Sequence, residues 1–259
     1  MTAPPPGRLL LVPTPLDHGC TPQAPITDVL PLGTLQAAAR ITHWISENAK
    51  STRAFLKRVD AVAPLAQPVQ AHTITELPRA VHKKGDHDPQ TAHPDVRPLL
   101  AAALKGHDVG LISEAGMPAV ADPGSSVVRA AHGLGIAVVP LVGPVSILLA
   151  LAASGLNGQN FAFVGYLPQE AAARATRIRE LEALARKTGQ SQLFIETPYR
   201  NAALVQALLH ELQPGTRLAI CHGLTLEHAR CVSQSVTDWR SATTAPASAA
   251  LPAVFAIGR

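Results

Sequence analysis

The chain has 259 residues, and 22 Lys and Arg against 18 Asp and Glu leave a formal net charge of +4. Hydrophobic residues make up 47% and charged residues only 15%, which excludes a disordered chain. Aromatic residues are scarce at 3%, whereas Ala alone supplies 44 residues. We therefore expect a core of Ala, Val, Leu and Ile in one large domain or two domains, because small side chains let helices pack closely on a sheet.

The charge and the cysteines limit the class of protein further. A net charge of +4 permits an acidic partner such as RNA without requiring one. The three cysteines, Cys20, Cys221 and Cys231, form no CxxC pair, which argues against a disulfide framework and favours a reducing, cytoplasmic compartment. The Pro-rich residues 1–7 contain no apolar stretch, so the sequence predicts no secretory signal.

One uncharged segment, residues 136–156, is long enough to span a bilayer. Pro140, Gly143 and Pro144 divide it into a short β-branched run and a separate apolar stretch. This division predicts a strand, a turn and a buried helix, and therefore no contact with a membrane.

The first half of the chain alternates apolar runs with helical segments. Residues 8–12, 109–113 and 136–139 predict strands, with a helix at 125–133 between the last two. This spacing is that of a βαβ unit, whose strands are parallel and continuously apolar. The other expected segments are a helix with a following apolar run at 34–45, a helix at 52–59 capped by Ser51 or Thr52, a strand at 69–74, a loop at 82–95, and a helix at 98–105 closed by Gly106.

The second half continues the same alternation of strands and helices, and we place the boundary near residue 145. The sequence therefore predicts an α/β protein with an N-terminal domain at 1–145 and a C-terminal domain at 146–259. The expected strands are 161–164, 193–196, 217–221, 229–233 and 253–257, the expected helices are 171–187 and 201–212, and 241–250 is a low-complexity loop.

The loop that follows the strand at 109–113 is the most informative stretch. Residues 113–124 read SEAGMPAVADPG, with two Gly, two Pro and two carboxylates before a helix. Ligands in open α/β sheets bind at the carboxyl ends of strands, and Gly permits a close approach of the backbone. Glu114 and Asp122 either line a pocket there or bind local backbone amides in a tight turn. The chain contains neither a dinucleotide fingerprint nor a P-loop.

Four further motifs stand beside that loop in the sequence. They are PLVGPVS at 140–146, AASGL at 152–156, FAFVGYLP at 161–168 and ETPYR at 196–200, and LVPTPL at 11–16 precedes them all. Together with 113–124 they resemble the tetrapyrrole methylase superfamily, the class III S-adenosylmethionine-dependent methyltransferases. The resemblance is strongest to the branch that methylates the 2′-oxygen of a cytidine ribose in small-subunit ribosomal RNA.

This resemblance implies two α/β domains with S-adenosyl-L-methionine in a cleft between them, and a homodimer. It implies RNA as the acceptor, through a ribose 2′-hydroxyl of ribosomal RNA. The cofactor-binding residues that it implies are Val12, Pro13, Glu114, Ala115, Gly116, Met117, Ser146, Ile147, Leu167, Thr197, Pro198 and Tyr199. Backbone amides at turns and helix starts suit the methionine carboxylate of such a cofactor, and a flat apolar slot suits its adenine.

The chain departs from the branch pattern at three places, all on the side expected to meet the acceptor. Where the branch has G-N-L after the first turn, this chain has Leu16-Asp17-His18. Where the branch has E-D-T-R, this chain has the longer segment 47–53. R-E-[LI]-T-K becomes His222-Gly223-Leu224-Thr225-Leu226 after Cys221. Two alternatives therefore stay open: a small-molecule or protein acceptor, and a cofactor-binding paralogue with weakened catalysis.

Three residues are candidates for catalysis. Glu47 and Arg53 either activate or clamp the acceptor, or they belong to a solvated helix start. Arg200 either binds a phosphate or pairs with Glu196.

Two charged segments have an ordinary interpretation and a functional one. The segment 82–95 lacks the regular spacing of a metal site, so we expect a solvated loop and no metal. If this loop instead covered the expected cleft, Lys83 and Lys84 would meet phosphate of the acceptor. The candidate ligands in this loop are His82, Asp86, His87, Asp88 and His93. The helix at 171–187 has either a solvated face or an RNA contact, formed by Arg174, Arg177, Arg179, Arg186 and Lys187.

Overall fold

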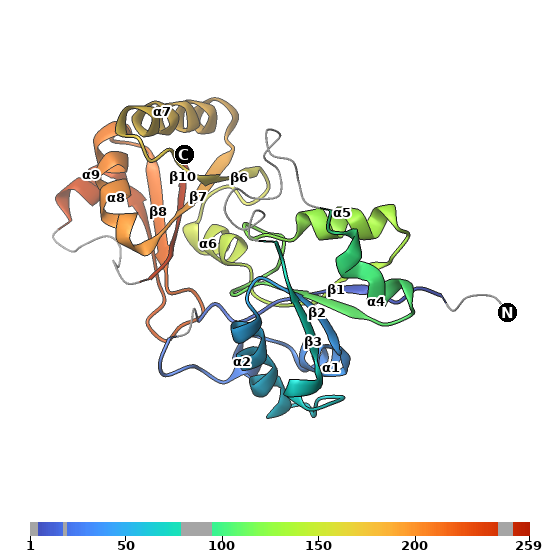
Figure 1. Cartoon of the computed structure of the whole chain (residues 1–259). Helices are drawn as coiled ribbons and strands as arrows, with labels where there is room; N and C mark the ends of the chain where they lie inside the picture. The colour runs from blue at the N-terminus through green and yellow to red at the C-terminus, as the bar shows by residue number, and fades with distance from the viewer. Residues whose placement is uncertain (1–4, 18–19, 79–94, 243–250) are drawn as a thin grey trace. The chain divides into compact units, whose positions relative to one another are not determined.

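The computed structural model describes residues 5–17, 20–78, 95–242 and 251–259. The chain divides into two compact units, Met1–Val145 and Ser146–Arg259 (Figure 1). Each unit contains one five-stranded sheet with helices packed on it, so the prediction of an α/β fold with two sheets is confirmed. Residues 82–94 of the predicted loop, with its histidines and Lys83 and Lys84, lie outside the described residues, as do residues 243–250 of the low-complexity loop.

The N-terminal sheet is entirely parallel, as the βαβ spacing predicted. Its order is β3-β2-β4-β1-β5, and every neighbouring pair in it is parallel. The strands are β1 (Leu9–Val12), β2 (His43–Ser46), β3 (Thr73–Glu76), β4 (Val109–Ile112) and β5 (Val138–Pro140). The third strand begins later than the predicted 69–74, because Pro68 starts a 3-10 turn at Val69–Ala71 in which the Ala71 amide donates to the Pro68 carbonyl oxygen.

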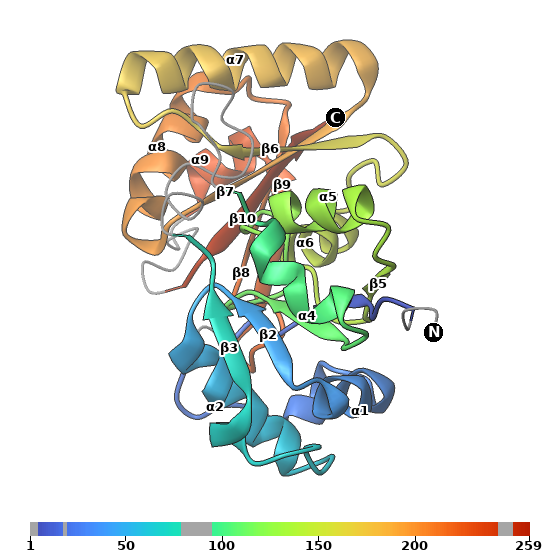
Figure 2. The same ribbon diagram turned by 45° about the vertical axis from the view of Figure 1, so that its right-hand side comes forward.

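Helices cover both faces of this sheet (Figure 2). On one face, α1 (Leu32–Arg40) and α2 (Ala49–Asp60) pack on Leu10, Trp44 and Ile112. On the other, the 3-10 turn Arg97–Leu100, α4 (Ala101–Leu104) and α5 (Ser125–Gly133) pack on Leu9 and Ile45. Burial on both faces explains why β1 and β4 read as continuous apolar runs.

The helix cap predicted at the start of α2 is wrong. The N-cap is Asn48, not Ser51 or Thr52, and its Oδ1 accepts hydrogen bonds from the amides of Lys50 and Ser51 at 2.9 and 3.4 Å. Asn caps as well as Ser does, and it lies at the first position where the backbone can be extended after β2. The two hydroxyls instead return to the Asn48 carbonyl oxygen within the first turn.

The C-terminal sheet does not repeat the parallel arrangement of the first. Its order is β6-β7-β10-β8-β9, and only the pair β6 and β7 is parallel. The last strand enters between β7 and β8 and runs antiparallel to both, and β9 is antiparallel to β8. The strands are β6 (Phe161–Tyr166), β7 (Ser191–Glu196), β8 (Arg217–His222), β9 (Arg230–Ser235) and β10 (Ala253–Gly258).

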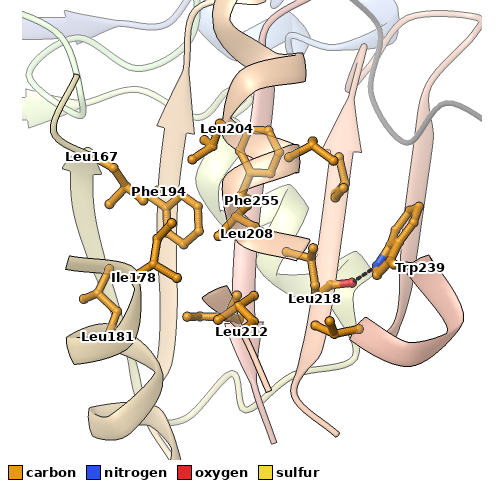
Figure 3. Close-up of a cluster of buried hydrophobic side chains, with 14 of the residues drawn as sticks. Leu167, Ile178, Leu181, Phe194, Leu204, Leu208, Leu212, Leu218, Trp239 and Phe255 are labelled. Atoms are coloured by element: carbon orange, nitrogen blue, oxygen red, sulfur yellow. Dashed lines mark hydrogen bonds between the residues drawn. The ribbon is translucent and has the colours of Figure 1, made fainter. Parts of the chain in front are cut away.

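In its described part, the C-terminal unit also contains four α-helices. The apolar helix α6 (Ser146–Ser154) packs on β10, β8 and β9. The other face carries α7 (Ala171–Thr188), α8 (Asn201–Glu211) and α9 (Val236–Ser241). Figure 3 shows the core on that face, where the Phe194 and Phe255 rings stack with centroids 5.8 Å apart and Trp239 donates to the Leu218 carbonyl oxygen at 2.8 Å.

The uncharged segment 136–156 forms β5, a turn and α6, as its Pro and Gly residues predicted. Among the described residues, no helix is long and apolar enough to cross a membrane.

Candidate functional site

The carboxyl ends of four adjacent parallel strands, β3, β2, β4 and β1, form one row in the N-terminal unit. Val12 is paired in register with Ile112, and Ile112 with Ser46. Ser46 is in turn paired with Glu76 on the edge strand β3. The loops that leave these strands therefore start at a common edge, which is where open α/β sheets bind ligands. Five of the predicted cofactor residues lie in these loops or directly before them, namely Pro13, Glu114, Ala115, Gly116 and Met117, and Val12 ends its strand at the same edge.

The loops after β1 and β4 are joined directly to each other. The Thr14 amide donates to the Gly116 carbonyl oxygen at 2.9 Å, and the Gly116 amide donates to the Thr14 carbonyl oxygen at 3.1 Å. Gly116 has a φ of +80°, and a Cβ there would lie 3.1 Å from Leu16. The structure thus brings the Val12–Pro13 and Glu114–Met117 predictions together.

A second connection joins the loop after β2 to the loop after β4. The Glu114 amide donates to Glu47 Oε2 at 3.2 Å, and Asn48 Nδ2 donates to Glu114 Oε1 at 3.0 Å. Beside them, Glu76 Oε1 accepts from the Ala49 amide at 2.8 Å. Glu47 therefore lies at the predicted site, and Asn48 and Glu76 join it although the sequence analysis passed over both. An Asn directly before an amphipathic helix is a cap signal that could have identified Asn48.

The loop after β4 has an unusual backbone. Ala119 and Ala121 have φ values of +65° and +63°, and Gly116 and Gly124 are also left-handed. Alanine in this region costs on the order of 1 kcal/mol or more, so the surrounding structure must impose the conformation. Gly124, where α5 begins, has a φ of +131°, which other residues rarely adopt, and a Cβ there would lie 2.9 Å from the Leu111 side chain.

Asp122 lies in this loop and has an altered affinity for protons. Burial, and then the charge of Glu47, raise its pKa to about 7 against a smaller opposing effect of the Ser113 hydroxyl. Glu114 raises it further. The carboxylate is therefore coupled to the other acids of the site and is not only the local turn residue that the sequence also allowed.

Arg53 is placed on the exposed side of α2. Its guanidinium donates to the carbonyl oxygen of Ala49, one turn earlier, at 3.4 Å. The insertion at residues 47–53 is thus accommodated as the cap and first turn of a helix. The prediction that Arg53 clamps an acceptor stays a prediction.

The departure at Asp17 has a structural reason. Asp17 Oδ2 accepts from Arg58 on α2 at 2.5 Å, and both side chains are largely buried. The same guanidinium donates to the Ala24 carbonyl oxygen at 3.0 Å. In this chain, an ion pair to α2 holds the segment that follows the first turn.

In the C-terminal unit, the segment after β7 is organised around Glu196. This buried carboxylate accepts from the Thr197 amide at 2.7 Å, from the Thr197 hydroxyl at 3.2 Å and from Arg200 at 2.7 Å. The Arg200 guanidinium also lies 5.3 Å from the centroid of the Tyr199 ring, and Tyr199 is 77% exposed. The pairing of Arg200 with Glu196, one of the two alternatives, is therefore present, and Thr197, Pro198 and Tyr199 form one short turn with it.

The other cofactor contacts predicted in this unit lie in residues that are more buried than Tyr199. Ser146 and Ile147 are the first two residues of α6, and Ile147 is buried. Leu167 follows β6 and packs in the core with Phe194 (Figure 3). Leu167 as a whole residue is 3% exposed, and its role in binding stays a prediction.

The end of β8 carries the third departure from the pattern. His222 is paired in register with Ala253, which is paired with Glu196 in turn, so the ends of β7 and β8 lie at one edge of the sheet. Burial, and then the charge of Arg230 on β9, lower the pKa of His222. This imidazole is therefore predominantly neutral at pH 7.

The arginines of α7 are largely engaged within their own unit. Arg177 pairs with Glu180 at 3.1 Å, Arg179 pairs with Glu211, and Arg174 donates to the Gln169 carbonyl oxygen. These contacts fit a solvated helix face better than an RNA contact. Within the described part of the chain, no group of three or more His, Cys, Asp or Glu could hold a metal ion.

Comparison with known proteins places this chain in a family. A family model described as Tetrapyrrole (Corrin/Porphyrin) Methylases matches residues 34–238. The chain belongs to this family. The resemblance seen in the sequence motifs is thereby confirmed, and S-adenosylmethionine is the methyl donor that the family uses.

The curated relatives include Ribosomal RNA small subunit methyltransferase I of Mesorhizobium japonicum, which is 41% identical over 127 residues. The match covers 49% of this chain and 42% of that relative. The chain thus spans less than half the length of this relative.

Solved structures share the fold across nearly the whole chain. The methyltransferase CobJ is 18% identical, with a TM-score of 0.56 over 98% of this chain and 94% of that chain. Uroporphyrin-III C-methyl transferase from Thermus thermophilus, complexed with S-adenosylhomocysteine, is 16% identical, with a TM-score of 0.51 and 98% coverage of both chains. At these identities the likeness concerns the fold alone.

Proposed function

We propose that this protein is an S-adenosylmethionine-dependent methyltransferase that methylates a ribose 2′-hydroxyl of ribosomal RNA. The observation that carries this proposal is the reciprocal pair of hydrogen bonds between Thr14 and Gly116, which builds a binding edge from the two loops of the family motif. The relative named for small-subunit ribosomal RNA methylation supports RNA as the acceptor.

The polar groups at this edge suit S-adenosylmethionine. Its amino group and ribose hydroxyls are hydrogen-bond donors, and Glu47, Glu76 and Glu114 supply acceptors. Its adenine needs apolar contact and its carboxylate needs N–H donors, and we propose that these groups bind along the loop Glu114–Met117. We therefore propose Val12, Pro13 and Glu114–Met117 as cofactor contacts. Ser146, Ile147, Leu167 and Thr197–Tyr199 remain predictions from the resemblance.

Methyl transfer places modest demands on the protein itself. The donor supplies a methyl group already activated on a sulfonium, so alignment accounts for most of the catalysis. A hydroxyl acceptor must lose its proton as it attacks, and Glu47 is the carboxylate that we propose for this step. Arg53 is proposed to clamp the acceptor. Arg200 is already neutralised by Glu196, so we propose that it fixes the turn of Tyr199 and that any contact with phosphate is secondary.

The first experiment tests the cofactor. Isothermal titration with S-adenosylmethionine and S-adenosylhomocysteine should give one site per chain, and Gly116→Val should weaken binding at least tenfold because its φ is left-handed. Gly158→Val is the matched control, since a Cβ there meets nothing within 4 Å. No heat of binding to the wild-type chain would refute the methyltransferase proposal.

The second experiment tests the acceptor. Ribose methylation should be mapped in ribosomal RNA from cells with the gene, from cells without it, and from deleted cells that carry a restored wild-type or Glu47→Gln copy. Loss of one 2′-O-methyl group in the deletion, recovered by the wild-type copy, is the expected result. Unchanged ribosomal RNA together with normal cofactor binding would favour a small-molecule or protein acceptor. Unchanged RNA with binding but no turnover on any acceptor would favour a paralogue with weakened catalysis.

Two further features belong to this proposal. We infer a homodimer from the resemblance, which light scattering on the purified chain would test. We also infer a cytoplasmic location, because ribosomal RNA is modified there and the chain's cysteines form no disulfide framework.

A further inference from the structure

Two cysteines lie opposite each other in the antiparallel pair β8 and β9. The register pairs Cys221 with Cys231 directly. Residues directly opposite in an antiparallel pair have Cα atoms about 4.5–5.5 Å apart and side chains on the same face. A disulfide requires Cα atoms about 4.4–6.8 Å apart, so the backbone already meets the requirement.

The surroundings of the two thiols differ. Cys221 is 1% exposed, and its thiol lies 3.9 Å from the Ala150 carbonyl oxygen on α6. Burial, followed by an interaction with the Cys231 thiol, raises the pKa of Cys221. Cys231 is only partly buried. One thiol is thus protonated and shielded, and its neighbour across the strands belongs to a partly exposed residue.

We propose that Cys221 and Cys231 form a thiol modification site at which a peroxide oxidises the pair to a disulfide between β8 and β9. The Cys231 thiolate attacks one peroxide oxygen, which breaks the O–O bond, gives a sulfenic acid and releases hydroxide. Cys221 sulfur then attacks the sulfenic sulfur, and the hydroxyl leaves as water with the Cys221 proton. The two thiols lose two electrons in total, and the peroxide takes them up.

The position of this pair gives the bond a defined effect. His222 and Arg230 are the next register pair toward the loop 223–229. Gly223 and Thr225 in that loop have left-handed backbones, with φ values of +62° and +70°. A disulfide would fix the base of the loop that carries the His222–Leu226 departure from the family pattern, and a thiol reductant would release it.

The experiment uses the full chain and hydrogen peroxide as the oxidant. The treated protein is alkylated, digested with trypsin without reduction and analysed by mass spectrometry. Trypsin cleaves after Arg230, so residues 218–230 and 231–240 separate unless a disulfide joins them. We expect the joined peptide, a loss of two hydrogens and protection of two of the three thiols, all reversed by dithiothreitol.

Cys20 provides the matched control, because it is partly buried like Cys231 but lies in the other unit. Cys20→Ser should form the joined peptide as the wild type does, and Cys231→Ser should lose it completely. Sulfinic acid on Cys231 with Cys221 still open to alkylation after unfolding would overturn the proposal. Disulfide-linked pairs of chains in place of the joined peptide would overturn it as well.

Discussion

The carboxylate of Glu47 accepts a hydrogen bond from the backbone amide of Glu114 at 3.2 Å. The two residues are 67 positions apart in the sequence, and they meet because β2 and β4 are neighbours with their carboxyl ends level. This contact places an acid predicted for catalysis beside a loop predicted to hold the cofactor.

Asn48 both caps α2 and donates to Glu114. We expect Asn48→Ala to lower the free energy of unfolding by about 1 kcal/mol, since two amides of the first turn lose their acceptor. Asn48→Ser should retain most of that stability, because Ser also caps, while it loses the contact with Glu114. Urea unfolding would measure the stability and calorimetry the affinity for the cofactor. Equal destabilisation by Ala and Ser would contradict the role as a cap.

Asp122 makes stability depend on pH near neutrality. Its folded-state pKa of about 7 lies above the ordinary 3.8, so the folded state holds the proton more tightly than the unfolded state does. The stability that this tighter proton binding provides is therefore fully present below about pH 4. It is lost as the pH rises to about 7 and Asp122 ionises in the folded state.

Asp122→Asn should remove the loss of stability at rising pH, because Asn does not ionise. The variant should be more stable than the wild type at pH 8, by on the order of 1 kcal/mol for each unit of the shift. Urea unfolding at several pH values would measure the difference. An identical pH dependence in the two proteins would show that Asp122 ionises normally.

His43 should act in the opposite direction at the amino end of β2. Burial, followed by the charges of His107 and His72, lowers its pKa, and the His43 and His107 rings stack with centroids 5.0 Å apart. The folded state therefore favours the neutral ring, and stability is lost as the pH falls below the ordinary value of 6.5. We expect the urea midpoint of His43→Gln to fall less than that of the wild type between pH 7.5 and pH 5.5. These two pH values lie on either side of the ordinary pKa of histidine. A fall as large as that of the wild type would assign the effect to other groups.

Gly143 allows the turn after β5 to pass close to the first loop. A Cβ at this position would lie 2.3 Å from Pro13 and 2.9 Å from Leu30. We expect Gly143→Ala to cost about 1–3 kcal/mol of stability, because Pro13 must move, and to weaken cofactor binding with it. Gly133→Ala is the control, since its Cβ would meet nothing within 4 Å, and it should gain about 0.4–1 kcal/mol. Thermal and urea unfolding would measure the change in stability of both variants.

Local patterns in the sequence were enough to predict most of the elements. The apolar runs at β1 and β4, the helix Ser125–Gly133 and the division of 136–156 by Pro and Gly were all predicted correctly. Strand propensity and turn chemistry act over a few residues, so they can be read directly. The family motifs also carried the resemblance, which the family match at 34–238 confirms.

Only the tertiary structure decided which of these pieces lie together. The last strand, β10, enters between β7 and β8, and no local pattern specifies that insertion because its hydrogen-bond partners lie more than 30 residues away. The pKa of Asp122 depends on burial and on Glu47, which the chain brings close only after the sheet has formed. The sequence by itself determined the elements and the family, because both depend on short stretches. Pairing, burial and the charges that a residue meets were decided by folding, because they arise between distant parts of the chain.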